Sequence, residues 1–173
     1  MPIYALGDLE PDIHPDAFVH PDAVVIGRVV IGARSSIWPA AVLRGDMETG
    51  IHIGAGTSIQ DGSVVHTTLA QATTVGDGCT VGHLVHLEGC IIEDGCLIGS
   101  GSVVLHHARV EAGALVGAAA LVPNHMVVPA GAMALGVPAR IKPDAADPDM
   151  IARAGAAYVR NCDRYRNGLR RLD

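Results

Sequence analysis

The chain has 173 residues, a length that suits one domain with a tail. Its formal net charge is −6, which argues against sequence-independent binding of nucleic acid or anionic lipid, because both need clustered Lys and Arg. Although 49% of the residues are hydrophobic, no run of about 18 apolar residues occurs, and the start M-P-I-Y-A-L-G-D does not resemble a signal peptide. We therefore expect a cytoplasmic protein that binds neither nucleic acid nor a membrane.

An aliphatic residue returns every six positions along most of the chain. The first repeats have this residue at Ile13, Val19, Val25, Ile31, Ile37 and Leu43. The loop R-G-D-M-E-T-G displaces the frame, which resumes at Ile53, Ile59 and Val65; after the loop T-T-L-A-Q-A-T-T it runs from Val75 to Val128. One repeat, which starts at Leu87, has only five residues. Such hexapeptides, with Gly and Asp at tight corners, predict a parallel β-helix with three hexapeptides to a coil.

This repeat predicts which side chains stack on one another. Residues one coil apart lie above each other at the strand spacing of about 4.8 Å. His66 and Glu88 are then vertical neighbours on one face, and Asp61 lies under His83 on the preceding face. His86 points outward from the same strand as Glu88. Several side chains that can bind metal therefore converge in adjacent coils.

The last part of the chain follows a different pattern. The repeats end at A-L-G-V-P-A-R, so we expect the β-helix at 1–142 and a connection with a C-terminal helix that packs on the coil at 143–173. Asp147 or a following residue can cap this helix. Its apolar positions recur at spacings of three and four: Ile151, Ala154, Tyr158, Cys162, Tyr165 and Leu169.

Four cysteines occur without C-x-x-C spacing, so they predict neither a zinc ribbon nor a disulfide framework. Cys79 and Cys96 take the small inward position of their repeats, one coil apart on the same face. We interpret both as core residues.

At these residues the chain resembles the γ-class carbonic anhydrase-like family. The matching segments include W-P-A-A-V-L-R-G-D, Q-D-G-S-V-V-H, V-G-H, L-E-G-C and G-V-P-A-R. The resemblance implies an all-β fold, a left-handed parallel β-helix of hexapeptide repeats with a C-terminal α-helix. It also implies a homotrimer with a divalent metal between subunits, zinc in the first place and iron or cobalt as alternatives.

The resemblance further implies a ligand set for that metal. The family's first ligand corresponds to His66 and its second to His83, which would come from the neighbouring subunit. Its third ligand, a His, corresponds to Glu88, and the nearest His is His86. Two sets are therefore open: His66, His83 and Glu88, or His66, His83 and His86. We interpret the remaining histidines as surface or core residues: His14, His20, His52, His106, His107 and His125.

Four further polar residues match the family's catalytic surroundings: Gln60, Arg44, Asp46 and Asp61. The resemblance implies an Arg44–Asp61 pair between subunits and a Gln60 that orients metal-bound water. The implied reaction is the reversible hydration of carbon dioxide to bicarbonate by metal-bound hydroxide, a lyase reaction of the carbonate dehydratase type. The loop T-T-L-A-Q-A-T-T contains no acidic residue, and Met47 follows Asp46 where the family has an acidic residue. Because few groups can then carry protons away from the metal, we expect weak or absent activity.

Two other classes of protein fit the repeat. A hexapeptide acyltransferase uses a His as general base beside an acyl-CoA cleft between subunits, but this chain has no long protruding loop. A non-catalytic binding or scaffold trimer would keep the metal for stability alone. Stoichiometric metal would exclude an ordinary acyltransferase, and a hydration assay with and without metal then separates enzyme from scaffold.

Overall fold

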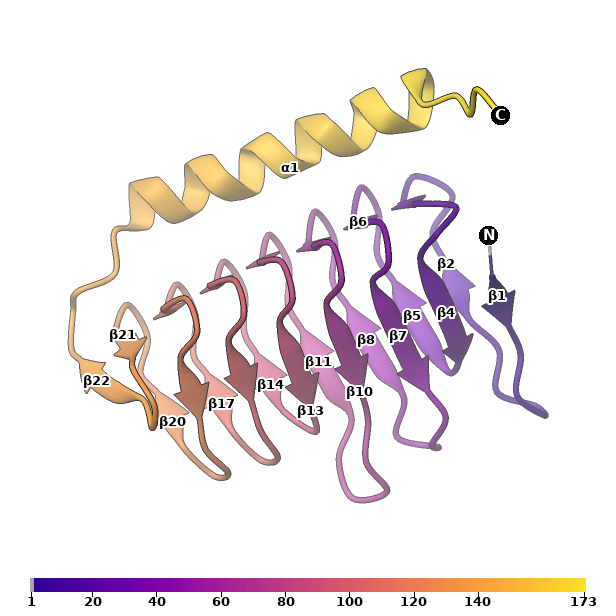
Figure 1. Ribbon diagram of the computed structural model, residues 1–173. Coiled ribbons are helices and arrows are strands. Elements are labelled where there is room, and N and C mark those ends of the chain that lie inside the picture. Colours follow the sequence, from indigo (N-terminus) through magenta and orange to yellow (C-terminus); the bar gives the residue numbers. More distant parts are fainter. Residues whose placement is uncertain (1) are drawn as a thin grey trace.

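The computed structural model, which describes residues 2–173, confirms a left-handed parallel β-helix with a C-terminal α-helix (Figure 1). Short strands form three sheets, and the chain visits them in turn, so that each circuit makes one coil. The coils stack along a single axis, and α1 (Pro148–Gly168) runs along one side of the stack.

The first sheet contains β1 (Ile3–Tyr4), β4 (Val24–Gly27), β7 (Val42–Gly45), β10 (Val64–His66), β13 (His86–Glu88), β16 (Val103–Val104) and β19 (Leu121–Val122). The second contains β2 (Asp12–Ile13), β5 (Val29–Ile31), β8 (Ile51–Ile53), β11 (Thr73–Val75), β14 (Ile91–Ile92), β17 (Arg109–Val110) and β20 (Val127–Val128). The third contains β3 (Phe18–Val19), β6 (Ser36–Ile37), β9 (Ser58–Ile59), β12 (Thr80–Val81), β15 (Leu97–Ile98), β18 (Leu115–Val116), β21 (Met133–Leu135) and β22 (Arg140–Lys142). All pairings are parallel except that of β21 with β22.

The core is a set of columns of aliphatic side chains inside the coil. In the first sheet, Val25, Leu43, Val65, Leu87 and Val104 stand in register and are each 0% exposed. The inward positions predicted from the six-residue repeat are buried throughout the run from 19 to 128. Each large aliphatic side chain removed from water in this way contributes about 1.5–3 kcal/mol. All four cysteines are buried free thiols, and Cys79 and Cys96 lie in the core as predicted.

The C-terminal helix begins where the sequence predicts. The carboxylate of Asp147 accepts hydrogen bonds from the backbone N–H groups of Asp149 and Met150, which caps the first turn. Ile151 and Cys162 are buried against the coil. Leu169 differs from the expected pattern: the backbone becomes extended there, so the helix ends at 168 and the Leu169 side chain is 46% exposed.

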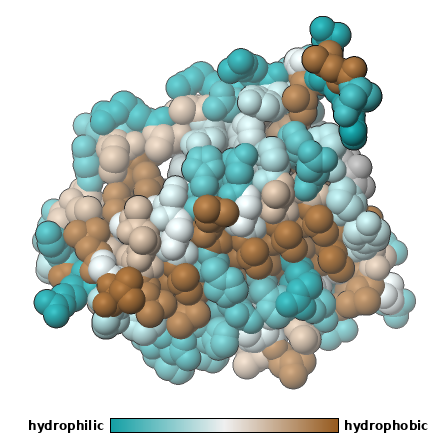
Figure 2. Space-filling view, viewed as in Figure 1, coloured by the Kyte–Doolittle hydropathy of each residue, from teal (hydrophilic) through white to brown (hydrophobic). Residues whose placement is uncertain are grey.

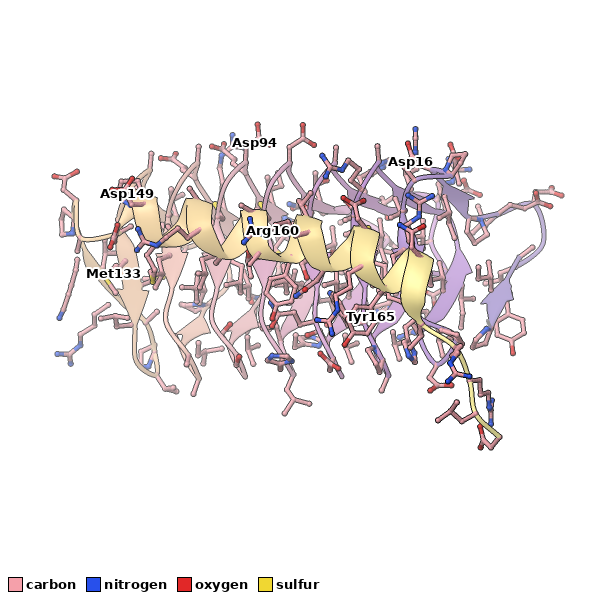
Figure 3. All side chains as sticks on the ribbon, turned by 90° about the horizontal axis from the view of Figure 1, so that it is seen from above. Asp16, Asp94, Met133, Asp149, Arg160 and Tyr165 are labelled. Carbon is pink, nitrogen blue, oxygen red and sulfur yellow. The ribbon has the colours of Figure 1, made fainter. Side chains whose placement is uncertain are left out.

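An aromatic cluster joins this helix to the third sheet. The rings of Tyr158 and Tyr165 contact Trp38 edge-on, at centroid distances of 5.8 and 4.8 Å. The Trp38 indole N–H donates to the hydroxyls of Ser36 and Ser58, so the polar group of this buried ring has hydrogen-bond partners. Seen from above, the helix runs along the axis of the coil, so that Tyr165 lies over the first coils (Figure 3). Within residues 2–173, no helix combines the length and the apolar character that a bilayer crossing requires.

The buried columns predict that two leucines in the same part of the chain contribute very differently to the free energy of unfolding. Leu87→Ala should lower the free energy of unfolding by about 2–5 kcal/mol, because it leaves a cavity inside the coil. Leu69→Ala is the control, since that side chain is 83% exposed in a loop; its effect should stay within about 0.5 kcal/mol. Urea denaturation followed by circular dichroism measures both, and equal losses would contradict the stacked core.

Candidate metal centre

Polar side chains gather where three neighbouring strands of the first sheet end. Parallel register places Arg44, His66 and Glu88 above one another on the outer face of β7, β10 and β13. This confirms the stacking of His66 and Glu88 predicted from the repeat. The Thr73 hydroxyl donates to the backbone carbonyl of His66 and accepts from the Gly89 N–H. These two hydrogen bonds hold the end of the loop between β10 and β11 next to His66 and Glu88.

His66 is held between two carboxylates. Its Nδ1 lies 2.8 Å from Glu88 Oε1, and its Nε2 lies 2.9 Å from Asp46 Oδ1. Because an ionised carboxylate can only accept, the two hydrogen bonds together require a proton on each ring nitrogen. Asp46 also pairs with Arg44. To bind a metal through one nitrogen, His66 must therefore give up one carboxylate partner.

Glu88 has two more histidine neighbours. His86 Nε2 lies 3.2 Å from Glu88 Oε2, and His106 Nε2 lies 3.5 Å from the same atom. The sequence predicts that His106 is a surface or core residue, whereas the structure places it beside Glu88. Leu105 is the residue above Glu88 in the column, and His106 reaches back from the corner that follows it. The signal in the sequence was its position directly after that column residue, one coil above Glu88.

Both carboxylates of this cluster stay ionised. Burial alone would raise the pKa of Glu88, but hydrogen bonds from His66, His86 and His106 outweigh it and hold the pKa below its usual range. Burial likewise would raise the pKa of Asp46, and the hydrogen bond from His66 and the charge of Arg44 lower it overall.

A second, smaller cluster lies at the corner that leads from the third sheet into the first. His83 Nδ1 lies 2.9 Å from Asp61 Oδ2, which confirms that the two residues stack. With Nδ1 donating to the carboxylate, Nε2 keeps its lone pair, and the His83 side chain is 51% exposed. Leu84, the next residue, has a φ of 58°, which fixes the tight corner. Gln60 precedes Asp61 and is only 4% exposed.

The two clusters lie at opposite edges of the first sheet. β10 runs from the Asp61 corner to His66, and β13 runs from the His83 corner to Glu88. In the described part of the chain, no three His, Cys, Asp or Glu side chains are arranged to hold a metal ion. The donor types, imidazole and carboxylate, fit zinc or a similar divalent ion. One subunit thus presents suitable ligands in two separate halves, which we call the Glu88 half-site and the His83 half-site.

The eight candidate residues divide between these half-sites. The Glu88 half-site holds Arg44, Asp46, His66, His86 and Glu88, and the His83 half-site holds Gln60, Asp61 and His83. Within the subunit Arg44 pairs with Asp46, at the opposite edge of the sheet from Asp61. The Arg44–Asp61 pair between subunits stays a prediction.

The surface between the half-sites is apolar. Val42, Val64, Val103 and Leu121 point outward in one in-register row across the first sheet, which His86 interrupts between Val64 and Val103. The Val64 side chain is 38% exposed, and α1 packs on the third sheet, away from this row. Figure 2 shows the apolar side chains as a band across this face.

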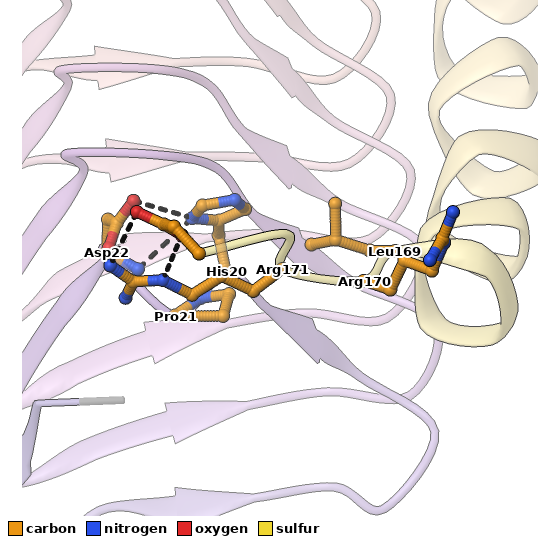
Figure 4. A pocket seen from close by; sticks show the side chains of 7 residues that line it. His20, Pro21, Asp22, Leu169, Arg170 and Arg171 are labelled. Atoms are coloured by element: carbon orange, nitrogen blue, oxygen red, sulfur yellow. Dashed lines mark hydrogen bonds and ion pairs between the residues drawn. The ribbon is translucent and has the colours of Figure 1, made fainter.

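A cavity of about 390 Å³ lies elsewhere, between the C-terminal tail and the corner of the first full coil (Figure 4). Its walls include His20, Asp22, Leu169 and Arg171. None of the candidate site residues lines it, so this hollow and the cluster of metal-binding side chains are different places.

Comparison with known proteins agrees with this architecture. Residues 10–45 and 72–106 match the family of the bacterial transferase hexapeptide (six repeats). The carnitine operon protein CaiE of Escherichia coli K12 is 38% identical over 150 residues, 87% of this chain and 76% of that protein. Gamma carbonic anhydrase 1, mitochondrial, of Arabidopsis thaliana is 43% identical over 104 residues, 57% of this chain and 38% of that protein.

A solved structure is close as well. The hexapeptide transferase family protein of Anaplasma phagocytophilum is 31% identical and has a TM-score of 0.89, covering 95% of this chain and 98% of that one. Fold and repeats together define a left-handed β-helix protein of the hexapeptide class. Within that class, the chain belongs to the γ-class carbonic anhydrase-like family.

The lowered pKa of Glu88 predicts how stability depends on pH in metal-free protein. A carboxyl whose pKa is lower in the folded state stabilises the fold above its unfolded pKa, about 4.3, and loses this effect as the pH falls through the folded value. Glu88→Gln should therefore be less stable than the parent by about 1–2 kcal/mol at pH 6. The difference should shrink below about pH 4.3. Denaturation in the presence of a chelator measures it, and a difference that grows in acid would contradict the assignment.

Proposed function

We propose that three copies of this chain form a ring that holds a divalent metal, zinc in the first place, between neighbouring subunits. This centre catalyses the reversible hydration of carbon dioxide to bicarbonate at a low rate. The observation that carries the proposal is the division of the ligands. Complementary half-sites lie at opposite edges of one sheet and in the same coils, where a neighbouring copy can join them.

A head-to-tail contact joins such edges naturally. When the Glu88 half-site of one copy meets the His83 half-site of the next, the interface is heterologous, and such an interface generates a ring when the rotation between copies closes. The apolar row on the first sheet supplies surface that an interface can bury. The resemblance to the γ-class family favours three subunits in the ring.

The protein's own side chains prepare the ligands. Asp61 accepts from Nδ1 of His83 and so leaves Nε2 as the ligand atom. Asp46 and Glu88 face the two nitrogens of His66, and whichever carboxylate keeps its hydrogen bond orients the ring when the other nitrogen binds. Arg44 holds Asp46 in place. A divalent metal held by these groups supplies Lewis acidity, which makes water a nucleophile near neutral pH.

Two features support a low rate. The loop at 67–72 carries no acidic side chain that could carry protons away from the centre. A carboxylate ligand at Glu88 adds negative charge beside the metal, which makes water there less acidic than three neutral imidazoles would.

An acyltransferase is the second candidate, because the hexapeptide transferase family protein of Anaplasma phagocytophilum shares the fold at 31% identity. Metal analysis of the purified protein separates the two functions. Stoichiometric zinc or iron supports the anhydrase-like centre, and acyl-CoA turnover by a metal-free preparation supports the transferase.

Sharing of the metal between subunits predicts complementation between two inactive variants. His66→Ala and His83→Ala should each lose the metal when prepared alone. Trimers reassembled from an equal mixture should regain roughly a quarter of the sites, because that share of interfaces joins an intact His66 to an intact His83. Mass spectrometry under native conditions counts metal ions per trimer.

The control for this experiment is a mixture of His66→Ala with the double variant His66→Ala/His83→Ala, which contains no intact His66 and should recover nothing. Failure of the first mixture to recover metal, although mixed trimers form, would place the ligands within one subunit and contradict the shared centre.

The two open ligand sets predict opposite results at Glu88 and His86. If Glu88 is the third ligand, Glu88→Ala should remove most of the metal, whereas His86→Ala should weaken binding by only about 10- to 100-fold, as partners of ligands do. Glu88→His should retain metal, because an imidazole takes the place of the carboxylate. Metal content after dialysis against a graded chelator series ranks the variants. An empty His86→Ala with a full Glu88→Ala would establish His86 as the ligand.

A further inference from the structure

Two histidines outside the half-sites stand together on the corner that leads from the first sheet to the second. His107 and His125 occupy equivalent places one coil apart, with φ values of 60° and 63°. Their backbone N–H groups donate to the coil below, to the carbonyls of Gly89 at 2.7 Å and His106 at 3.1 Å. Both α-carbons are therefore fixed by the corner, and both side chains are exposed.

The two imidazole rings face each other. Their centroids are 4.9 Å apart and their planes differ by 9°. Neither ring has a carboxylate ion-pair partner in residues 2–173. Two imidazoles bound to one tetrahedral ion at about 2.0 Å have centroids roughly 5 Å apart. In the stacked arrangement the in-plane lone pairs of the two rings do not converge, so binding a shared ion requires both exposed side chains to rotate about their side-chain bonds.

A residue of the loop at 67–72 hydrogen-bonds to one of these two rings. The Gln71 side-chain oxygen accepts a hydrogen bond from His107 Nδ1. Because an amide oxygen cannot donate, the proton of His107 is on Nδ1, and Nε2 keeps its lone pair. Ligand histidines in metal sites characteristically donate their second nitrogen in this manner.

We propose that His107 and His125 form a second metal-binding site, which takes a borderline transition-metal ion such as Cu²⁺, Ni²⁺ or Zn²⁺. The two imidazoles are its protein ligands, water fills the other positions, and Gln71 orients His107. Imidazole nitrogen suits all three ions. The site lies at the same edge of the first sheet as the Glu88 half-site, one and two coils further along the axis, and uses none of its residues.

The test uses the His66→Ala/His83→Ala double variant without an affinity tag, so that the proposed shared centre does not contribute. Titration with Cu²⁺ alone, followed by electron paramagnetic resonance, should show one ion per chain with two nitrogen ligands. His107→Asn and His125→Asn should each weaken binding more than tenfold. Asn is chosen because it tolerates positive φ and keeps the corner folded.

The remaining variants separate the site from general surface binding. Gln71→Leu should weaken binding by roughly tenfold and Gln71→Glu should preserve it, since a carboxylate also accepts from Nδ1. His52→Asn is the control, because His52 is exposed on the second sheet. Equal Cu²⁺ affinity in the His52, His107 and His125 variants would overturn the proposal. The result does not depend on the proposed function, whose failure would appear instead as equal resident metal content in the parent protein and the double variant.

Discussion

Hydrogen bonding between successive parallel coils is the constraint on which the rest of this structure depends. Each strand pairs in register with the strands one coil below and above, so the repeat sets the vertical neighbours of each outward side chain. His66 meets Glu88, and His83 meets Asp61, for this reason alone. The same ladder buries the aliphatic columns, so stability and the placement of polar groups have a common origin.

The repeat made much of this arrangement predictable. The inward residues, the stacked pairs and the helix cap at Asp147 all follow from spacing and local chemistry, and the structure confirms them. His106 could not be found in this way, because it contacts Glu88 diagonally from a corner, and the repeat defines columns only along the strands. The spacing of apolar residues also does not reveal where the helical backbone ends. The helix ends at residue 168, although Leu169 continues the apolar pattern.

The polar residues show a second limit of the sequence. The spacing of residues within one chain cannot reveal a ligand set that is divided between two edges of a sheet. The repeat describes which residues stack within one subunit, and not which residues meet between subunits. Only the resemblance suggested that His83 serves a neighbouring copy. In the subunit the His83 side chain is 51% exposed, which leaves it accessible to another copy. Asp46 and Glu88 hydrogen-bond to His66 from both sides, so metal binding at His66 must compete with these hydrogen bonds.

The antiparallel last strand, β22, affects whether these molecules can join end to end at high concentration. A bare parallel coil would offer an open edge on which the first coil of another molecule could continue the ladder, and such edges are templates for fibres. β22 runs antiparallel to β21 and covers the end of the third sheet with a strand of opposite polarity. The C-terminal end of the solenoid is thereby terminated, and end-to-end polymerisation is disfavoured on that side.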